Sequence, residues 1–267
     1  MGPVSYGTPA FFFAPRWPTS TGMSDGAIPA ATVVVMRDML SGPPQLLMVE
    51  RARSMVFAGG AIVFPGGRID ATDEAIAPGF DRAARVAAIR ETLEESAIAV
   101  GLSPTPTPEQ SLALQEALHG GESFDALLER SRLSLDLDAL TPFARWKPAF
   151  KHARVFDTLF LLARAAEGDW TPRHQAGECE AAFWLTAEDA LDRIERGEAS
   201  AIFPTKRNLE RLAQHGSVDE VMADAAAYPV ELITPWIEER DGKPHVRIPE
   251  GLGYPVTSEP LATAFRA

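Results

Sequence analysis

The sequence predicts a domain that combines β-strands with α-helices, and two observations support this. Residues 30–37 are a short apolar run rich in β-branched side chains, and residues 155–163 are a second short apolar run, both typical of buried strands. Residues 80–98 instead repeat apolar side chains at helical spacing, and a helix with so broad an apolar surface packs into a core. The chain of 267 residues is long enough to bury a large core.

The composition excludes several classes of protein. With 37 acidic and 25 basic residues the net charge is −12, which argues against a nucleic-acid backbone as the main partner. No apolar run approaches the length of a membrane-spanning helix, so we expect none. A single cysteine, Cys179, excludes an internal disulfide and is typical of a reducing compartment, so we expect a cytoplasmic protein.

The first predicted strands lead to a glycine pair. Residues 30–37 and 45–51 flank a Ser-Gly-Pro-Pro turn and predict a β-hairpin. Residues 61–64 form a third short apolar run, followed by Pro65 and two glycines. We interpret this point as a strand that ends in a tight loop, where glycine allows the backbone to approach a ligand closely.

The predicted helix over residues 80–98 carries an unusual group of acids. Glu91, Glu94 and Glu95 stand at positions i, i+3 and i+4, which share one helix face. Such a cluster is either a solvated surface or the ligand set of a hard divalent cation. Free acids are costly on a buried helix, which favours the cation, and Arg90 is placed to pair with Glu94.

The same residues carry a resemblance to a known family. Residues 90–95 read Arg-Glu-Thr-Leu-Glu-Glu, and they follow a strand that ends in the Phe-Pro-Gly-Gly of residues 64–67. This pattern resembles the Nudix box, G…REUxEExGU with U a bulky apolar residue, of the Nudix hydrolases. Gly67 opens the box, and Ile98 is its closing apolar residue.

The box departs from the usual pattern in three ways. Gly67 and Arg90 are 23 positions apart, which is more than the usual spacing, so residues 71–81 are interpreted as an insertion in the box loop. Arg82 stands where a box glutamate is expected, eight positions before Arg90. Ala97 replaces the late box glycine. None of these departures touches the three carboxylates.

The resemblance implies an α/β (α+β) fold of the Nudix type, an α/β/α sandwich with a mixed sheet. We expect residues 1–26, rich in Pro, Gly, Ser and Thr, to be a flexible tail and residues 27–267 to be a single Nudix hydrolase domain. Within it we expect the box at 67–98, a helical insertion at about 103–140 and a C-terminal extension at about 217–267. Further predicted elements are helices over 111–119, 124–133, 186–196 and 206–215, a strand over 181–185, and a hairpin of 230–237 with 243–248 around an Asp-Gly turn.

The resemblance also implies a reaction, the metal-dependent hydrolysis of a phosphoanhydride bond in a nucleoside diphosphate linked to a group X. Carboxylate and carbonyl ligands without a His/Cys set favour Mg²⁺ or Mn²⁺. Glu91, Glu94 and Glu95 are expected to hold the metal, with a backbone carbonyl at Gly66 or Gly67, and Arg90 is expected to orient the carboxylates.

One more acidic residue is expected from a later loop. Nudix enzymes often add a glutamate a few residues before a tryptophan, and here the run Gly-Glu-Cys-Glu precedes Trp184. Glu178 matches best as a metal ligand or general base, and Glu180 is second; the alternative is a surface acid. A box glutamate is the other candidate for the base. Cys179 lies between them and is expected to pack rather than react.

A partial match upstream points to a substrate. Coenzyme A diphosphatases of the family carry a motif before the box, and Leu47, Arg51, Ala52, Gly60 and residues 64–67 stand at matching positions. The motif's threonine and second arginine are replaced by Val49 and Val56. Arg51 and Arg53 are candidate substrate-binding residues. The long box insertion and a later Trp-Lys-Pro…Arg-Val-Phe-Asp-Thr segment resemble the long-insert coenzyme A diphosphatase branch and its bacterial relatives.

A small basic island interrupts the acidic chain. Lys151, His152 and Arg154 precede the strand at 155–163. Ordinary solvated charge and a phosphate clamp are the two interpretations, because an acidic phosphoanhydride enzyme needs local cations to offset its field.

The expected substrate is coenzyme A or acyl-coenzyme A. ADP-ribose, NADH, dinucleoside polyphosphates and NTPs are the alternatives within the same reaction. An alternative of another class is a nucleotide-binding regulatory Nudix module without turnover. The expected partner is a small nucleoside diphosphate derivative, with no nucleic acid and no membrane, and a homodimer is one option for assembly.

Overall fold

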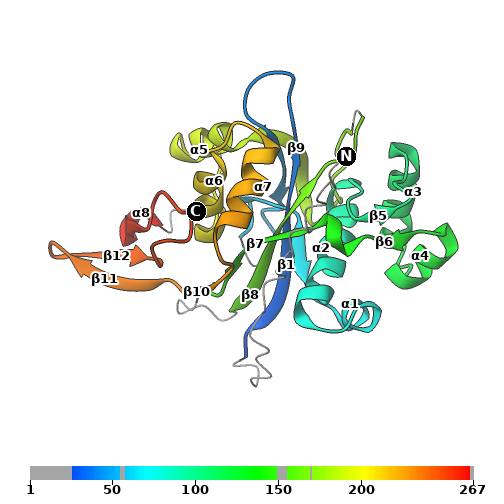
Figure 1. Cartoon of the computed structure of the whole chain (residues 1–267), viewed down its shortest axis with the longest axis horizontal. Helices are drawn as coiled ribbons and strands as arrows, with labels where there is room; N and C mark the ends of the chain where they lie inside the picture. Colours follow the sequence, from blue (N-terminus) through cyan, green and yellow to red (C-terminus); the bar gives the residue numbers. More distant parts are fainter. Residues whose placement is uncertain (1–25, 55–57, 149–154, 169, 265–267) are drawn as a thin grey trace, which may run out of the picture.

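The computed structural model describes residues 26–54, 58–148, 155–168 and 170–264. Its centre is an eight-stranded mixed sheet with helices on both faces, which confirms the expected α/β/α sandwich (Figure 1). The strands are β1 (Ile28–Arg37), β2 (Gln45–Arg51), β3 (Ile62–Val63), β4 (Gly66–Arg68), β7 (Thr141–Trp146), β8 (Phe156–Arg164), β9 (Cys179–Thr186) and β10 (Leu232–Ile233). Their order is β10-β7-β8-β1-β2-β3, with β4 paired to β1 and β9 paired to β2.

Strand β1 is the centre of the sheet. It pairs in parallel with β8 from Ile28↔Phe156 to Met36↔Arg164, and it pairs antiparallel with both β2 and β4. Its side chains alternate between the faces, with Val33 packed on one side and Val34 on the other. Because helices cover both faces, the strand is an almost continuous apolar run.

Two groups of helices cover the sheet (Figure 1). One core joins the sheet to the helices that follow the glycine pair, and the other joins it to the later helices and the C-terminal segment. On the first face lie α1 (Ala71–Ile76), α2 (Phe80–Ser96), α3 (Pro108–His119) and α4 (Phe124–Ser131), and on the second lie α5 (Ala187–Glu195), α6 (Phe203–Leu212) and α7 (Val218–Ala227).

Smaller elements complete the described chain. A three-stranded sheet projects from the C-terminal end of the molecule (Figure 1). Among the described helices, none is both long enough and apolar enough to cross a lipid bilayer. The small elements are β5 (Leu102–Ser103), β6 (Ser134–Leu135), a 3₁₀ turn (Leu137–Ala139), β11 (Trp236–Arg240), β12 (Lys243–Arg247), β13 (Ser258–Pro260) and α8 (Leu261–Ala264).

The predicted C-terminal hairpin is correct at its turn but wrong in its first strand. Strands β11 and β12 pair through Arg240↔Lys243 around the Asp-Gly turn, as expected. The predicted strand over 230–237 is instead divided, since β10 joins the main sheet beside β7 and β11 joins the small sheet. Pro235 lies between them, and proline has no backbone N–H to continue a ladder.

The region of the glycine pair also differs from its prediction. Gly66 and Gly67 were expected in a loop, but they belong to β4, which pairs antiparallel with Ala30, Ala31 and Thr32 of β1. The insertion at 71–81 contains α1, a short helix whose N-terminus is closed by Asp70 and Asp73 in a capping box. The glycines therefore lie in a strand, and the predicted insertion that follows them contains a helix.

Helix α2 ends at a residue with a left-handed backbone. Ala97 has φ 57° and ψ 16°, and its N–H donates to the carbonyl of Leu93. This conformation is the usual place of glycine, since a Cβ crowds the backbone there. The helix therefore ends where the box pattern has its late glycine, although this chain has alanine.

We expect Ala97→Gly to stabilise the protein by about 0.5–1 kcal/mol, because the left-handed backbone costs alanine more than glycine. Chemical denaturation of the purified variant measures this change. Ala88→Gly in the middle of the same helix is the matched control, and it should destabilise by about 1 kcal/mol or more. A destabilised Ala97→Gly variant would contradict the assignment of strain to this cap.

Candidate active site

Helix α2 carries three carboxylates, and two of them, Glu91 and Glu95, contact strand β4. The Glu91 and Glu94 side chains are 16% and 25% exposed, and Glu95 is 3% exposed. The backbone N–H of Gly66 donates to Oε2 of Glu95 at 3.0 Å. A Cβ on Gly67 would lie 2.3 Å from Oε1 of Glu91. The glycine pair thus brings the β4 backbone into direct contact with Glu91 and Glu95.

Arg90 is bound more fully than the sequence predicted. Its expected contact with Glu94 is present, but at 3.5 Å it is the longest of the side chain's hydrogen bonds. Nη1 donates to Oε1 of Glu91 at 2.9 Å, and Nη2 donates to the carbonyl of Arg68 at 3.2 Å. Nε and Nη2 donate to the two carboxylate oxygens of Asp73 at 3.0 and 2.8 Å. Asp73 was not among the predicted site residues.

Burial and mutual repulsion weaken the acidity of the cluster. Burial raises the pKa of Glu91, and the charge of Glu94 adds to this, against the opposing charge of Arg90. Burial also raises the pKa of Glu95, with further contributions from Glu91 and Glu178, while the Gly66 N–H and Arg51 oppose it. The neighbouring arginines therefore do not fully offset the negative charge of these carboxylates, and a divalent cation would supply the missing positive charge.

Of the two candidate acids near β9, Glu178 is the one beside the cluster. Burial raises the pKa of Glu94, and the charge of Glu178 raises it further. The Glu180 side chain instead accepts a hydrogen bond from the backbone N–H of Arg53 at 3.1 Å. Cys179 between them is buried, and burial raises the pKa of its thiol to about 12, consistent with packing rather than reactivity.

Arg51 lies at the same end of the sheet. It pairs with Cys179 across β2 and β9, and the N–H of Ala52 donates to the carbonyl of Glu178 at 2.8 Å. The charge of Arg51 lowers the pKa of Glu95, so the arginine is close to the carboxylates. Arg53 contributes its backbone to the Glu180 contact. Lys151 and Arg154 lie outside the described residues.

Helix α3 holds the end of the acidic helix, which sequence reasoning did not foresee. The Gln115 side chain donates to the carbonyl of Glu94 at 2.9 Å, and Nε2 of His119 lies 3.0 Å from the same oxygen. The hydroxyl of Ser111 donates to the carbonyl of Ala97 at 2.7 Å. Carbonyls at a helix C-terminus have no partner within the helix, so these contacts satisfy them.

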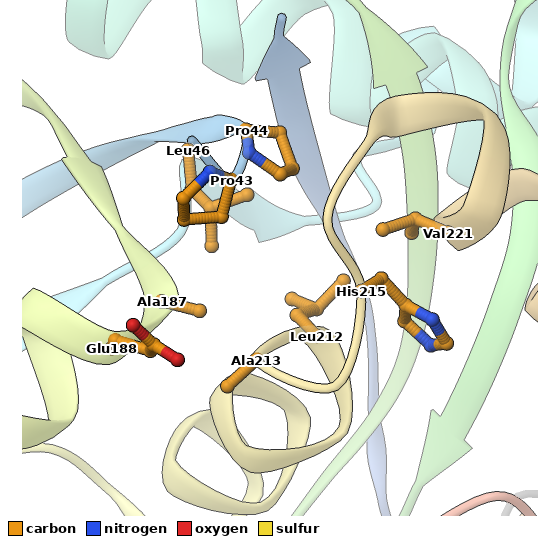
Figure 2. Close-up of a pocket in the computed structure, with 9 residues that line it drawn as sticks. All are labelled: Pro43, Pro44, Leu46, Ala187, Glu188, Leu212, Ala213, His215 and Val221. Carbon is orange, nitrogen blue, oxygen red and sulfur yellow. The ribbon is translucent and has the colours of Figure 1, made fainter. Parts of the chain in front are cut away.

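A pocket elsewhere in the molecule is not a candidate for the active site. It is lined by residues that include Pro43, Pro44, Leu46, Leu212 and Val221, on the sheet face covered by α5–α7 (Figure 2). Its volume of about 10 Å³ is that of a single water. None of the predicted site residues lines it.

Comparison with known proteins tests the resemblance. No protein-family model matches the chain. The chain is similar to the solved structure of a Nudix hydrolase from Alicyclobacillus acidocaldarius, with 30% sequence identity, 76% of this chain and 97% of that chain covered, and a TM-score of 0.64. The chain belongs to the Nudix hydrolase family. The predicted family and its enzymatic class are thereby confirmed.

Two further solved structures show weaker likeness to this Nudix hydrolase. One is the NUDIX domain of Shewanella oneidensis NrtR complexed with ADP ribose, with 14% identity, 70% of this chain and 86% of that chain covered, and a TM-score of 0.42. The other is a C. elegans Ap4A hydrolase binary complex, with 18% identity, 63% and 88% covered, and a TM-score of 0.33.

The carboxylates of this Nudix hydrolase are occupied by protein donors. Arg90 binds one oxygen each of Glu91 and Glu94, and Gly66 binds one of Glu95. Over the described ranges, no three acidic, histidine or cysteine side chains already stand in a geometry that holds an ion. The donor chemistry nevertheless suits a hard cation, because buried carboxylates with raised pKa values lie beside a backbone that no side chain shields.

Proposed function

We propose that this Nudix hydrolase cleaves a phosphoanhydride bond in a nucleoside diphosphate linked to a group X, with the help of Mg²⁺ or Mn²⁺. One observation carries the proposal: Glu91 and Glu95 of α2 meet the backbone of Gly67 and Gly66, and Arg90 joins Glu94 to Glu91. Three acids close together on a partly buried helix face are stabilised by a nearby positive charge. A diphosphate substrate also needs positive charge at the site, because the protein itself has a net charge of −12.

The residues have separate roles in this proposal. Glu91, Glu94, Glu95 and the backbone carbonyl of Gly67 would hold the metal, and Glu178 would be either a further ligand or the general base. A bound Mg²⁺ or Mn²⁺ offsets the charge of the diphosphate and lowers the pKa of a water that attacks phosphorus. Because the fold already positions these carboxylates, they need little rearrangement during the reaction, which keeps the activation free energy low.

Proton transfer is assigned to the acid that is free to move. Glu178 is exposed, and its charge reaches Glu94 and Glu95. An exposed carboxylate beside the reacting group can accept the proton of the attacking water and release it to solvent. A box glutamate is the second candidate for this base. Arg90 orients Glu91 and Glu94 through its hydrogen bonds.

We propose coenzyme A or acyl-coenzyme A as the substrate. The partial upstream motif supports this proposal, since Arg51 ends β2 opposite the start of β9 and its charge acts on Glu95, at the edge of the carboxylate cluster. An arginine there can bind a phosphate oxygen of the substrate. Arg53, Lys151 and Arg154 are further candidates for phosphate contacts. ADP-ribose, NADH, dinucleoside polyphosphates and NTPs are the competing substrates.

A substrate panel tests the reaction and the substrate together. Coenzyme A, acyl-coenzyme A, ADP-ribose, NADH, diadenosine polyphosphates and NTPs are incubated with the enzyme and Mg²⁺ or Mn²⁺, and the products are separated. We expect cleavage of coenzyme A into 3′,5′-ADP and phosphopantetheine. Dephospho-coenzyme A is the matched control, and its slower cleavage would show that the 3′-phosphate is recognised.

Other outcomes of the panel separate the alternatives. Preferred cleavage of another compound keeps the reaction and rejects coenzyme A. Mn²⁺ binding without cleavage of any compound contradicts the hydrolase proposal and supports a nucleotide-binding regulatory module.

We also propose that residues 27–267 are one domain, with the insertion and extension at the bounds given above. We propose that the protein works in the cytoplasm on a small molecule. A homodimer is the proposed option for its assembly, and light scattering tests it.

A further inference from the structure

The loop before β9, residues 170–178, is fastened to the end of the acidic helix. The N–H of Arg173 donates to the carbonyl of Ser96, the last residue of α2, at 2.8 Å. The carbonyl of Arg173 accepts a hydrogen bond from Nε2 of Gln115, on α3, at 2.7 Å. Both backbone groups of Arg173 thus have partners outside the loop, and this residue is held in place shortly before Glu178.

Gln115 joins three segments of the chain through one amide group. The residue is 3% exposed, and the same Nε2 also donates to the carbonyl of Glu94 at 2.9 Å. A glutamine amide has two N–H donors, so one serves the acidic helix and the other serves the loop. Helix α3 of the insertion therefore links the backbone at Glu94 to the backbone at Arg173.

The position of Glu178 depends on the backbone of this loop. Its side chain is exposed, so it takes its place from the chain that carries it rather than from packing. The carbonyl of Glu178 accepts a hydrogen bond from the N–H of Ala52 at 2.8 Å, which holds the end of the loop. The Gln115 contact at Arg173 holds its middle. Between these two contacts the loop brings the charge of Glu178 close enough to act on Glu94.

We propose that Gln115 is a positioning residue that sets the place of Glu178 beside Glu94, so that helix α3 of the insertion is part of the hydrolytic site. The inference rests on the proposed function, because Glu178 acts there as a metal ligand or as the general base. The effect passes through the backbone, since Gln115 fixes Arg173 relative to Glu94. A displacement of about 1 Å in an active site can cost about 100-fold in rate.

A second contact of α3 provides the comparison. Ser111 lies four residues before Gln115, so the two side chains share one face of the helix. The buried hydroxyl of Ser111 donates to the carbonyl of Ala97 at 2.7 Å, and this contact fastens α3 to the end of α2 rather than to the loop. If α3 served only to stabilise α2, the loss of either contact would have the same consequence.

Steady-state kinetics and amide hydrogen exchange of the full chain test the inference with Gln115→Met. Methionine has a side chain of similar length but no N–H donor. The Glu94 carbonyl keeps Nε2 of His119 at 3.0 Å, so the loss falls on Arg173. We expect kcat to fall about tenfold or more with KM little changed. The Arg173 amide should exchange faster, while the amides of β1 exchange as in the wild type and show that the fold is intact.

Ser111→Ala is the matched control. It should keep the wild-type kcat and the wild-type exchange of the Arg173 amide, even where its unfolding temperature falls. Gln115→Asn is a milder second variant, because it keeps the donors on a side chain one methylene shorter, and its loss of kcat should be smaller than that of Gln115→Met. Equal losses of kcat in Ser111→Ala and Gln115→Met would indicate a role in local folding only and would overturn the assignment to Gln115.

A double-mutant cycle shows whether Gln115 acts through Glu178. We expect Gln115→Met to cost no further kcat in the Glu178→Gln background, since the anchor has no role once the carboxylate is gone. Two losses that multiply, or a wild-type kcat in Gln115→Met, would overturn the inference alone. Unchanged exchange of the Arg173 amide in Gln115→Met would also overturn it, whatever the activity. A wild type that cleaves no compound of the panel would overturn the proposed function, and the role of Gln115 in hydrolysis with it.

Discussion

Replacing Glu95 with glutamine is expected to remove hydrolysis while the protein remains folded. Glutamine keeps the size of the side chain but removes the negative charge from a position that is 3% exposed beside Gly66. Loss of a partner around a metal ligand costs about 10–100-fold in activity, and loss of a ligand itself should exceed this. A steady-state assay on the preferred substrate measures the change.

The stability of the same variant should move in the other direction. Burial raises the pKa of Glu95, so the charged form is costly in the metal-free fold. The neutral amide avoids this cost, and we expect thermal unfolding without metal at an equal or higher temperature than the wild type. Glu94→Gln should also lose activity in a folded protein. Unchanged rates in both variants would contradict the metal-site assignment.

Gly67→Ala is expected to impair metal binding and hydrolysis with little effect on folding. The new Cβ would lie 2.3 Å from Oε1 of Glu91, which is the mobile end of a long side chain. Glu91 can therefore turn away at small cost to stability, but it then leaves the cluster. We expect Mn²⁺ affinity to fall about 10–100-fold, measured by calorimetric titration.

The neighbouring glycine provides a control with the opposite signature. A Cβ on Gly66 would lie 2.3 Å from the carbonyl oxygen of Ala31 and 2.6 Å from the Cα of Thr32, both in the backbone of β1. That clash cannot be relieved by a side-chain rotation, so Gly66→Ala should lower the unfolding temperature. A Gly67→Ala enzyme with wild-type Mn²⁺ affinity would show that the close approach to Glu91 is not needed.

The main strands and the acidic helix could be predicted from local patterns, whereas the sandwich fold was implied by the family resemblance. The apolar runs of β1 and β8 and the spacing of Glu91, Glu94 and Glu95 are visible in short stretches of sequence. Their meaning as a Nudix box came from the joint occurrence of those acids with Phe-Pro-Gly-Gly. Comparison with a 30% identical Nudix hydrolase then confirmed the family.

The missed features depend on contacts between distant residues. Asp73 meets Arg90 across 17 positions, and Gln115 meets the carbonyl of Glu94 across 21, so neither follows a helical or strand period. The division of β10 from β11 did have a local signal in Pro235. Likewise the capping box of Thr107 and Gln110 signals that α3 begins at Pro108, before the predicted start.

Diffraction from crystals grown with Mn²⁺ tests the central claim most directly, because the anomalous signal locates the ion itself. The account predicts a strong peak bonded to carboxylate oxygens of Glu91, Glu94 and Glu95 beside the carbonyl of Gly67, with Arg90 still held by Asp73. A fully occupied ion elsewhere, with these carboxylates still bound only by Arg90 and Gly66, would contradict the account.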